Sequence, residues 1–228
     1  MIRITWYGHA CFRLETADAS LVTDPYTPAL AGLEPVPEPA DAVVMSSALD
    51  EAHSCAAMVP GSPAVFNALE LVGRRTEILD GVVLEAIAAS EGSDRPDDPK
   101  ANALYRIELD GFAVCHMGDV GTRLAEAQLA PFRDRVDVLL ALAGGGLTIP
   151  LRDLEVGIAE LRPAVVVPMH YATPSLRYAC GPVEDFLAAY DPKQVVRHDS
   201  STLELDAVEA TGRPAIHVLR PLLDPAVV

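Results

Sequence analysis

The chain opens with apolar residues at every second position. Ile2, Ile4 and Trp6 are separated by polar residues, the pattern of a strand with one buried face. Similar short segments follow, and many end at residues typical of turns. Strands are expected at 12–14, 20–23, 42–45, 76–79, 82–88, 105–109, 112–116, 136–142 and 165–167, with short ones near Val195, Leu203 and Ile216.

Three segments have helical features. Ser62-Pro63 is typical of a helix start, because Ser caps well and Pro suits the first helical position, and Ala64, Ala68, Leu69 and Val72 would then share one face. Leu151 to Leu161 has helical spacing, and a third helix is expected after Gly181-Pro182, carrying Phe186, Leu187 and Tyr190. The Pro-rich stretch 25–39 and the polar stretch 90–100 predict loops. Strands and hairpins come first and strand–helix units later, an order that predicts a layered α/β or α+β domain.

Composition adds limits on size and partners. The 228 residues are 50% hydrophobic and 22% charged, so residues 1–228 are expected to form a single folded domain. The net charge is −16 with only 17 Lys and Arg, which disfavours nucleic acid and anionic membranes as partners. A small-molecule ligand fits better, and the oligomeric state is not predicted.

Cysteine usage and the N-terminus suggest a compartment. Cys11, Cys55, Cys115 and Cys180 form no C-x-x-C pair, so reduced, mostly buried thiols are expected. The chain starts as a strand, without the features of a signal peptide, and no apolar run has the length of a membrane span. These observations predict a cytoplasmic protein.

Several His and carboxylate residues follow predicted strands, where loops converge. They are His9, Asp24, Asp50, Glu51, His53, His116, Asp119 and His170. Such side chains together are ligands of zinc, manganese or iron. Each one alone has a structural explanation: Asp24-Pro25 and Gly118-Asp119 are turn formers, and a lone His is usually a hydrogen-bonded structural residue.

Four sequence segments together resemble a known family. WYGHACFRLE with LVTDPY, CHMGDVG, VDVLLALAGGGLTI and VVVPMHYATP occur in the order found in the lactonase-like branch of the metallo-β-lactamase superfamily. The resemblance covers most of the chain, from Trp6 to Pro174. It implies an α+β fold, a four-layer αββα sandwich, with the site at one edge between two β-sheets.

This chain departs from the metal-binding motif of that family. The resemblance implies two metals held by an H-x-H-x-D-H motif, a later His, an Asp and a final His. Aligned without gaps, Ser47, Leu49, Glu51 and Ala52 replace the four motif residues, and Ser90 replaces the later His. Asp119 and His170 match outright, and His9 and Asp24 match outside the ligand set.

A one-residue bulge in the motif loop gives a different alignment. His53 then occupies the last His position and Asp50 the second, while Ala52 replaces the Asp. The sequence leaves both alignments open.

Two functions of different class follow. The favoured one is a homologue that has lost most of the two-metal site and serves a non-catalytic binding or assembly role, since a two-metal mechanism needs both ions. The alternative is a one-metal hydrolase of an ester, lactone or phosphodiester that uses Glu51, Asp119 and His170. The cofactor is accordingly none or one divalent metal, zinc or manganese.

The favoured function also predicts what fills the vacated site. Glu51 and Asp119 would form a carboxylate–histidine cluster with His170 as its centre, His9 nearby and the remaining cleft residues Asp24, Asp50, His53 and His116 around it. Leu49 would pack into the lost first site.

Overall fold

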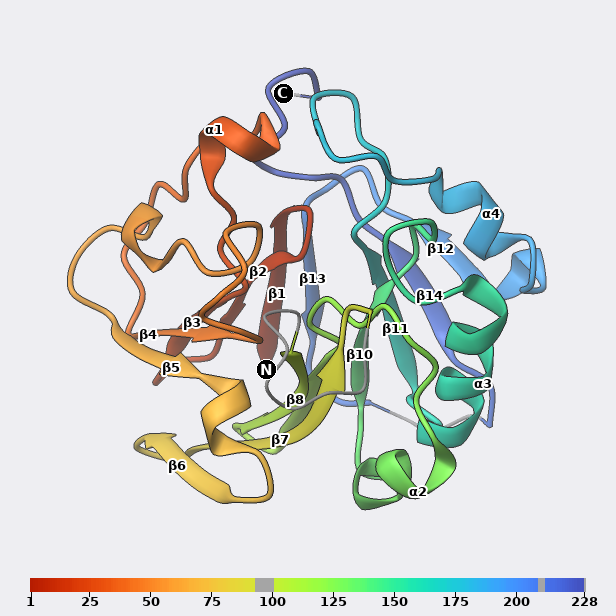
Figure 1. Cartoon of the computed structure of the whole chain (residues 1–228), viewed down its shortest axis with the longest axis horizontal. Helices are drawn as coiled ribbons and strands as arrows, with labels where there is room; N and C mark the ends of the chain where they lie inside the picture. Colours follow the sequence, from red (N-terminus) through yellow and green to blue (C-terminus); the bar gives the residue numbers. More distant parts are fainter. Residues whose placement is uncertain (93–100, 209–211, 228) are drawn as a thin grey trace.

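Two β-sheets pack against each other in the computed structural model, which describes residues 1–92, 101–208 and 212–227 (Figure 1). The first sheet has six strands in the order β13-β1-β2-β3-β4-β5. Its strands are β1 (Ile2–Gly8), β2 (Cys11–Glu15), β3 (Ser20–Thr23), β4 (Ala42–Met45), β5 (Ala64–Asn67) and β13 (Thr202–Leu205).

The second sheet has eight strands in the order β12-β14-β11-β10-β9-β8-β7-β6. They are β6 (Arg75–Leu79), β7 (Val82–Ser90), β8 (Ala101–Leu109), β9 (Phe112–His116), β10 (Val138–Leu142), β11 (Val165–Met169), β12 (Val195–Arg197) and β14 (Ala215–Val218). Strands β6 to β9 are antiparallel, and the pairings from β9 to β12 are parallel. The change follows the sequence, because hairpins precede strand–helix units.

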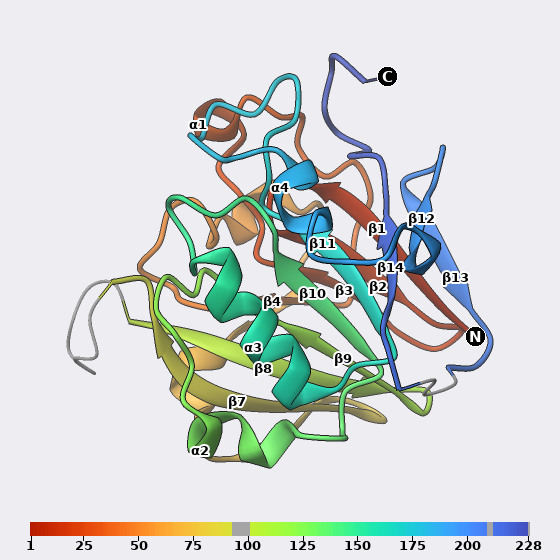
Figure 2. The ribbon, with the colours of Figure 1, turned by 90° about the vertical axis from the view of Figure 1, so that its right-hand side faces the viewer.

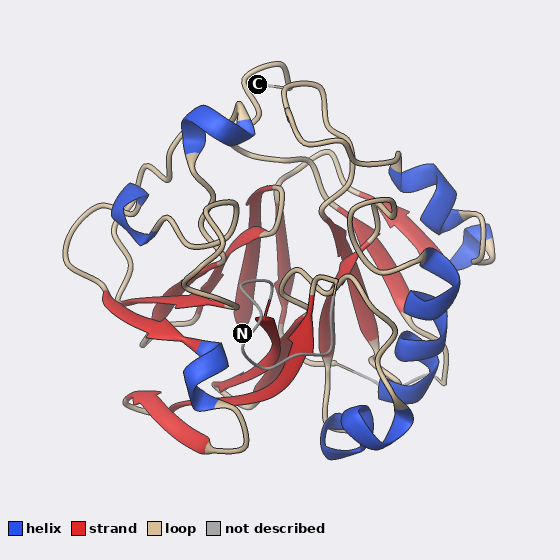
Figure 3. Ribbon diagram, viewed as in Figure 1, coloured by secondary structure: helices blue, strands red, loops and turns tan. Residues whose placement is uncertain are grey.

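Helices cover the outer face of the eight-stranded sheet (Figures 2 and 3). They are α2 (Glu126–Leu129), α3 (Leu151–Leu161) and α4 (Val183–Leu187). The six-stranded sheet is covered by α1 (Pro28–Ala31), the short 3₁₀ helix Ala56–Met58 and the loops around them. The fold is thus the predicted α+β sandwich, with a thin outer layer on one side.

Alternation along β1 divides the apolar residues between two cores. Ile2, Ile4 and Trp6 belong to the main cluster, which also contains buried residues of the eight-stranded sheet and of α3 and α4. Tyr7 points the other way, into a smaller cluster under α1 and its loops. The period of two predicted one buried face for this strand, and the structure buries most of the second face as well, with Arg3 exposed.

The prediction of a helix that starts at Ser62-Pro63 is wrong. Residues Ala64–Asn67 form β5, which pairs in parallel with β4, and only Ala68–Leu71 make a 3₁₀ turn. Pairing with β4 provides strand hydrogen bonds that outweigh a weak helical spacing. Ala64 and Val65 are also exposed, so these residues form no buried helical face.

The other predicted elements are confirmed with small shifts in their bounds. The 151–161 helix is α3, and the helix after Gly181-Pro182 is α4, which ends at Leu187, before Tyr190. The Pro-rich loop contains the four-residue α1, and β7 extends through Ser90. Most of the polar loop predicted at 90–100 lies outside the described residues. In the described part of the chain, every helix is too short or too polar to cross a membrane.

Candidate metal centre

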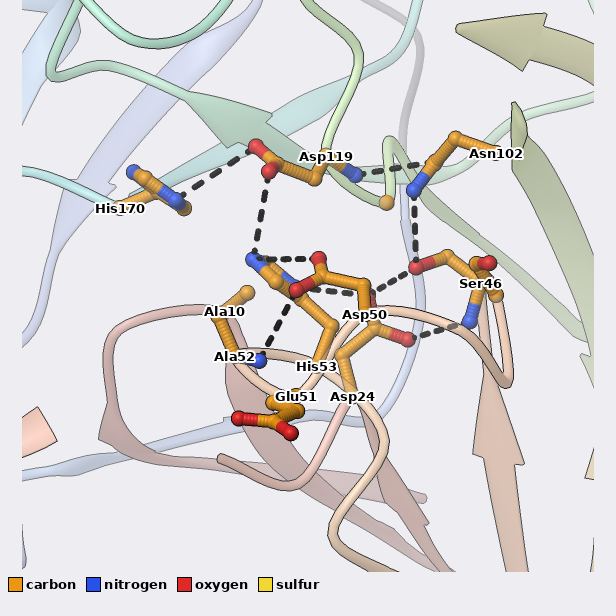
Figure 4. A network of polar contacts seen from close by, with 12 residues as sticks. Ala10, Asp24, Ser46, Asp50, Glu51, Ala52, His53, Asn102, Asp119 and His170 are labelled. Atoms are coloured by element: carbon orange, nitrogen blue, oxygen red, sulfur yellow. Dashed lines mark hydrogen bonds and ion pairs between the residues drawn. The ribbon is translucent and has the colours of Figure 1, made fainter. Parts of the chain in front are cut away.

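Loops from both sheets bring the candidate side chains together at one edge of the sandwich (Figure 4). His9 lies in the β1–β2 turn, Asp24 directly after β3, and His53 in the loop after β4. Asp119 follows β9 and His170 follows β11. The strand-end placement expected from the sequence is thus what the structure shows.

His53 is the centre of this group, and its side chain is fully buried. Its Nδ1 lies 3.2 Å from Asp24 Oδ2. Its Nε2 lies 3.8 Å from Asp50 Oδ2 and 3.6 Å from Asp119 Oδ2. On the other side of Asp119, Oδ1 lies 3.5 Å from His170 Nε2. The sequence placed His170 at the centre, and the structure places His53 there instead.

A tight turn explains why Asp50 and His53 reach the site together. The His53 N–H donates to the Asp50 carbonyl at 3.0 Å, and the Ala52 N–H donates to Asp50 Oδ1 at 2.9 Å. Asp at the first position of such a turn is favoured because its side chain accepts a nearby backbone hydrogen bond. The turn directs residues 50 and 53 inward, as in the bulged alignment that the sequence left open.

Glu51, expected as a ligand, does not join the group. Its side chain is exposed, while its carbonyl accepts a hydrogen bond from the Thr27 hydroxyl at 2.8 Å. Leu49, expected to fill the lost first site, is 69% exposed. Both expectations failed for the same reason: the turn at 50–53 shifts the ungapped alignment by one residue.

Ser47 and Ser90, which replace two first-site His residues, are both buried. In the described part of the chain, the groups of three or more candidate metal donors are His9–His53–His170 and Asp50–His53–Asp119. Both groups contain His53. The donor set is therefore centred on His53, with Asp50 and Asp119 in one group and His9 and His170 in the other.

Asp24 is a buried anchor for His53. Its Oδ1 accepts from the Ser46 N–H at 2.8 Å and from the Tyr105 hydroxyl at 3.0 Å. Its Oδ2 accepts from Ser46 Oγ at 2.7 Å and from the His53 ring. Burial opposes ionisation, but electrostatic interactions with His116 and His53 and hydrogen bonds from His53 and Ser46 lower the Asp24 pKa overall. The carboxylate fixes the ring so that Nε2 faces the other donors.

A hydrogen-bonded chain connects the two sheets beneath the site. Ser46 Oγ lies 3.4 Å from Asn102 Nδ2, and Asn102 Oδ1 accepts from the Asp119 N–H at 3.0 Å. Gly118 makes the close approach feasible, because a Cβ there would lie 2.3 Å from Asn102 Oδ1 and its φ is +61°. Ser46, Asn102 and Tyr105 had no signal in the sequence, since they are single polar residues in or beside apolar strands.

His116, a predicted cleft residue, is committed to the backbone. Its Nε2 donates to the Ala10 carbonyl at 2.8 Å, and its Nδ1 accepts from the Gly118 N–H at 2.9 Å. Burial lowers its pKa, with Asp24 acting in the opposite direction. His116 is thus a neutral structural residue that supports the turn carrying Asp119, as the simpler explanation held.

Three residues of the candidate site have a strained backbone conformation. His9, Asp24 and His170 have φ values of +53°, +39° and +54°, in the left-handed region that residues other than Gly rarely adopt. The His9 carbonyl accepts from the His170 N–H at 2.9 Å and from the Trp6 indole at 3.0 Å. Such strain persists only where surrounding contacts fix the chain, and it is frequent at functional sites.

The three His residues differ in protonation. Burial lowers the pKa of His9 well below the ordinary range and that of His170 to about 4. Burial also opposes the charging of His53, but Asp119, Asp24 and Asp50 raise its pKa to about 9. In the metal-free protein, His9 and His170 are neutral, the form that ligates metals, and His53 carries the proton that a metal would displace.

These pKa shifts predict how the stability of the metal-free protein depends on pH. His53 has a pKa above its ordinary 6.5, so its stabilising contribution is complete below pH 6.5 and is lost as the pH rises through 9. The His170 pKa is depressed, so its contribution is present above pH 6.5 and is lost as the pH falls toward 4. The urea midpoint of chelator-treated protein should therefore peak near pH 6.5.

In the variant His53→Gln, the loss of stability between pH 6.5 and 9 should disappear, while the acid loss remains. An equally steep alkaline loss in this variant would contradict the assignment to His53.

The residues present fit a divalent metal ion. His9 Nδ1, Asp50 Oδ2, His53 Nε2 and Asp119 Oδ1 are buried without a hydrogen-bond partner among the described residues. The three donor separations along Asp50, His53, Asp119 and His170 are 3.5–3.8 Å, longer than hydrogen bonds. Ligand atoms about 2.0–2.2 Å from a shared tetrahedral ion are about 3.3–3.6 Å apart. Each contact is close to that separation, with Asp119 offering Oδ2 to His53 and Oδ1 to His170.

Comparisons with known proteins agree with the fold, which is that of the metallo-β-lactamases. The model of the β-lactamase superfamily domain matches residues 3–170, most of the chain. The chain therefore belongs to the β-lactamase superfamily.

Individual relatives support the same assignment. A protein from Thermotoga maritima, classed with Zn-dependent hydrolases of the metallo-β-lactamase superfamily, is 30% identical and superposes with a TM-score of 0.75 over 96% of this chain and 98% of its own. A UPF0173 metal-dependent hydrolase of Anaeromyxobacter dehalogenans is 29% identical over 85% of this chain and 82% of its own. A metallo hydrolase from Ignicoccus hospitalis, 21% identical with a TM-score of 0.65 over 96% of this chain and 95% of its own, shares the fold.

Proposed function

We propose that this chain is a hydrolase that works with one divalent metal ion, held by His53, Asp119 and His170. The observation that carries the proposal is the position of the Asp119 carboxylate between two imidazoles, with Oδ2 3.6 Å from His53 Nε2 and Oδ1 3.5 Å from His170 Nε2. His53 Nε2 and Asp119 Oδ1 are buried and have no hydrogen-bond partner among the described residues. A buried polar atom without a partner is costly, so such atoms imply a missing partner. The relatives named metal-dependent hydrolases support the same class of activity.

One ion, rather than two, follows from the residues on the other side of the site. Ser47 and Ser90 are the residues that the ungapped alignment places at two His positions of the first metal, and in the bulged alignment Asp50 is the donor that remains on that side. A neutral hydroxyl is a poor ligand for zinc compared with imidazole, thiolate or carboxylate. His9, whose ring centroid lies 4.1 Å from that of His170, is an additional donor beside the proposed ion.

A divalent ion held here supplies Lewis acidity toward water and a substrate oxygen. The chain's own groups orient the metal donors and accept a proton from water. Asp24 fixes the His53 ring, and the chain through Ser46 and Asn102 fixes Asp119. The Asp50 side chain is 17% exposed, and its Oδ2 has no hydrogen-bond partner among the described residues. We assign Asp50 as the group that accepts the proton of the attacking water. The substrate class is an ester, lactone or phosphodiester.

The test is metal content followed by activity. Protein purified without chelator should contain about one equivalent of zinc or manganese by elemental analysis. Two equivalents would contradict a single centre, and none, even after incubation with each metal, would favour a non-catalytic role. Metal-loaded protein should hydrolyse p-nitrophenyl acetate or bis(p-nitrophenyl) phosphate, and chelation should abolish the activity. A fully loaded but inactive protein against a broad ester, lactone and phosphodiester panel would overturn the hydrolase assignment.

A further inference from the structure

One buried hydroxyl beside the proposed metal centre is neither a metal donor nor part of the hydrogen-bonded network around it. Tyr178 lies in the loop between β11 and α4, and its Oη is buried without a hydrogen-bond partner among the described residues. Buried hydroxyls normally find a partner, and an unmet donor destabilises the fold. A ligand present only during function would supply that partner.

The position of Tyr178 points to a ligand of the metal centre. Its ring centroid lies 4.7 Å from that of His9, which in turn contacts the rings of His53 and His170. Burial raises the pKa of Tyr178 to about 12, and the nearby Asp50 and Glu51 carboxylates act in the same direction. The hydroxyl therefore keeps its proton at neutral pH and is available as a donor.

The loop holds Tyr178 in place before any ligand arrives. The Ala172 N–H donates to the Gly181 carbonyl at 2.9 Å, and the Cys180 N–H donates to the Tyr178 carbonyl at 2.9 Å. Arg177, the preceding residue, donates through its backbone to Ala31 and through Nη1 to Ala29, each at 2.9 Å. A fixed donor needs little reorganisation when charge develops nearby.

We propose that Tyr178 Oη donates a hydrogen bond to the substrate oxygen on which negative charge develops, the carbonyl oxygen of an ester or lactone or a non-bridging oxygen of a phosphodiester. This inference rests on the proposed function. Tyr178 is then a catalytic residue outside the metal-ligand set. A donor that binds the developing oxyanion more tightly than the neutral substrate lowers the barrier without strengthening substrate binding equally.

The first test reads binding rather than turnover. Wild type and Tyr178→Phe are loaded with cobalt(II), and inorganic phosphate is titrated against the visible spectrum. Loss of one donor should raise the dissociation constant for phosphate about tenfold, in the range of one hydrogen bond to a charged group. The cobalt spectrum recorded without phosphate should be the same in the variant as in wild type. The urea midpoint should be unchanged or higher. The matched control is Tyr190→Phe, at a half-buried tyrosine that packs against Phe186 of α4, and it should leave every readout unchanged.

The second test compares the effect of the substitution on kcat with its effect on KM. With p-nitrophenyl acetate or bis(p-nitrophenyl) phosphate, kcat of Tyr178→Phe should fall about 100-fold, as for loss of one oxyanion donor, with KM changed little. Equal phosphate affinity and equal kcat in the variant would overturn the inference. So would an altered cobalt spectrum before phosphate is added, because Tyr178 would then shape the metal centre. If wild type binds cobalt and phosphate but hydrolyses nothing, the proposed function fails while the phosphate titration still decides the role of Tyr178.

Discussion

Replacing His53 by alanine should remove the metal ion and destabilise the fold at the same time. Its ring is the one side chain that belongs to both donor groups of the described residues, and it lies within 3.8 Å of the carboxylates of Asp24, Asp50 and Asp119. Without His53, three carboxylates would face a buried space with no cation among them. Removing one partner from a buried charged group costs about 3–5 kcal/mol.

Two measurements check the His53→Ala prediction. Bound metal should fall from about one equivalent to almost none, and urea unfolding in chelator should show a loss on the order of 3–5 kcal/mol. The matched control is Glu51→Ala, two residues away and exposed, which should change stability by no more than about 0.5 kcal/mol. If Glu51→Ala lost the metal and His53→Ala kept it, the ungapped alignment would be right and a metal centre at His53 would be wrong.

Replacing Asp24 by asparagine should weaken metal binding although Asp24 is not a proposed ligand. Oδ1 accepts two hydrogen bonds, from Ser46 and Tyr105, and Oδ2 accepts two more, from Ser46 and His53. An amide must turn its NH₂ toward one of these pairs, and each pair contains one N–H donor, the Ser46 backbone or the protonated His53 ring, so at least one hydrogen bond is lost whichever way it lies. The His53 ring then loses its orientation, and loss of such a partner typically costs 10–100-fold in metal affinity.

Calorimetric titration with zinc or manganese measures that loss for Asp24→Asn. The metal-free variant should also unfold more readily, by about 3–5 kcal/mol, because a fully buried network is broken. Asp18→Asn, an exposed substitution of the same kind, should leave affinity and stability unchanged. Unaltered metal affinity in Asp24→Asn would show that His53 is oriented without this carboxylate.

The two predictions depend on residues that the sequence revealed to different degrees. Asp24 was visible as an acidic residue at a strand end, but its four hydrogen-bond donors belong to Ser46, His53 and Tyr105, which lie 22, 29 and 81 positions further along the chain. A one-dimensional pattern contains no information on which strand ends meet. Ser46 and Asn102 were missed for this reason.

Local patterns determined much of this protein. Alternating apolar residues and helical spacing in 151–161 predicted nearly every strand and the helix α3, because these periods arise from the geometry of strand and helix themselves. The short helices α1 and α2 were not predicted. The pattern misled at Ala64–Asn67, where pairing with β4 outweighed propensity.

Tertiary structure decided the site. The sequence offered two alignments of one loop, and the turn from Asp50 to His53 selected the bulged one by directing Asp50 and His53 inward and Glu51 outward. A shift of one residue reverses which side chains face the interior, and only the packing of that loop against Asp24, Asp119 and His170 fixes the register. The sequence by itself thus determined the sheets and the edge where the chemistry lies, whereas the packed structure determined which histidine stands at its centre.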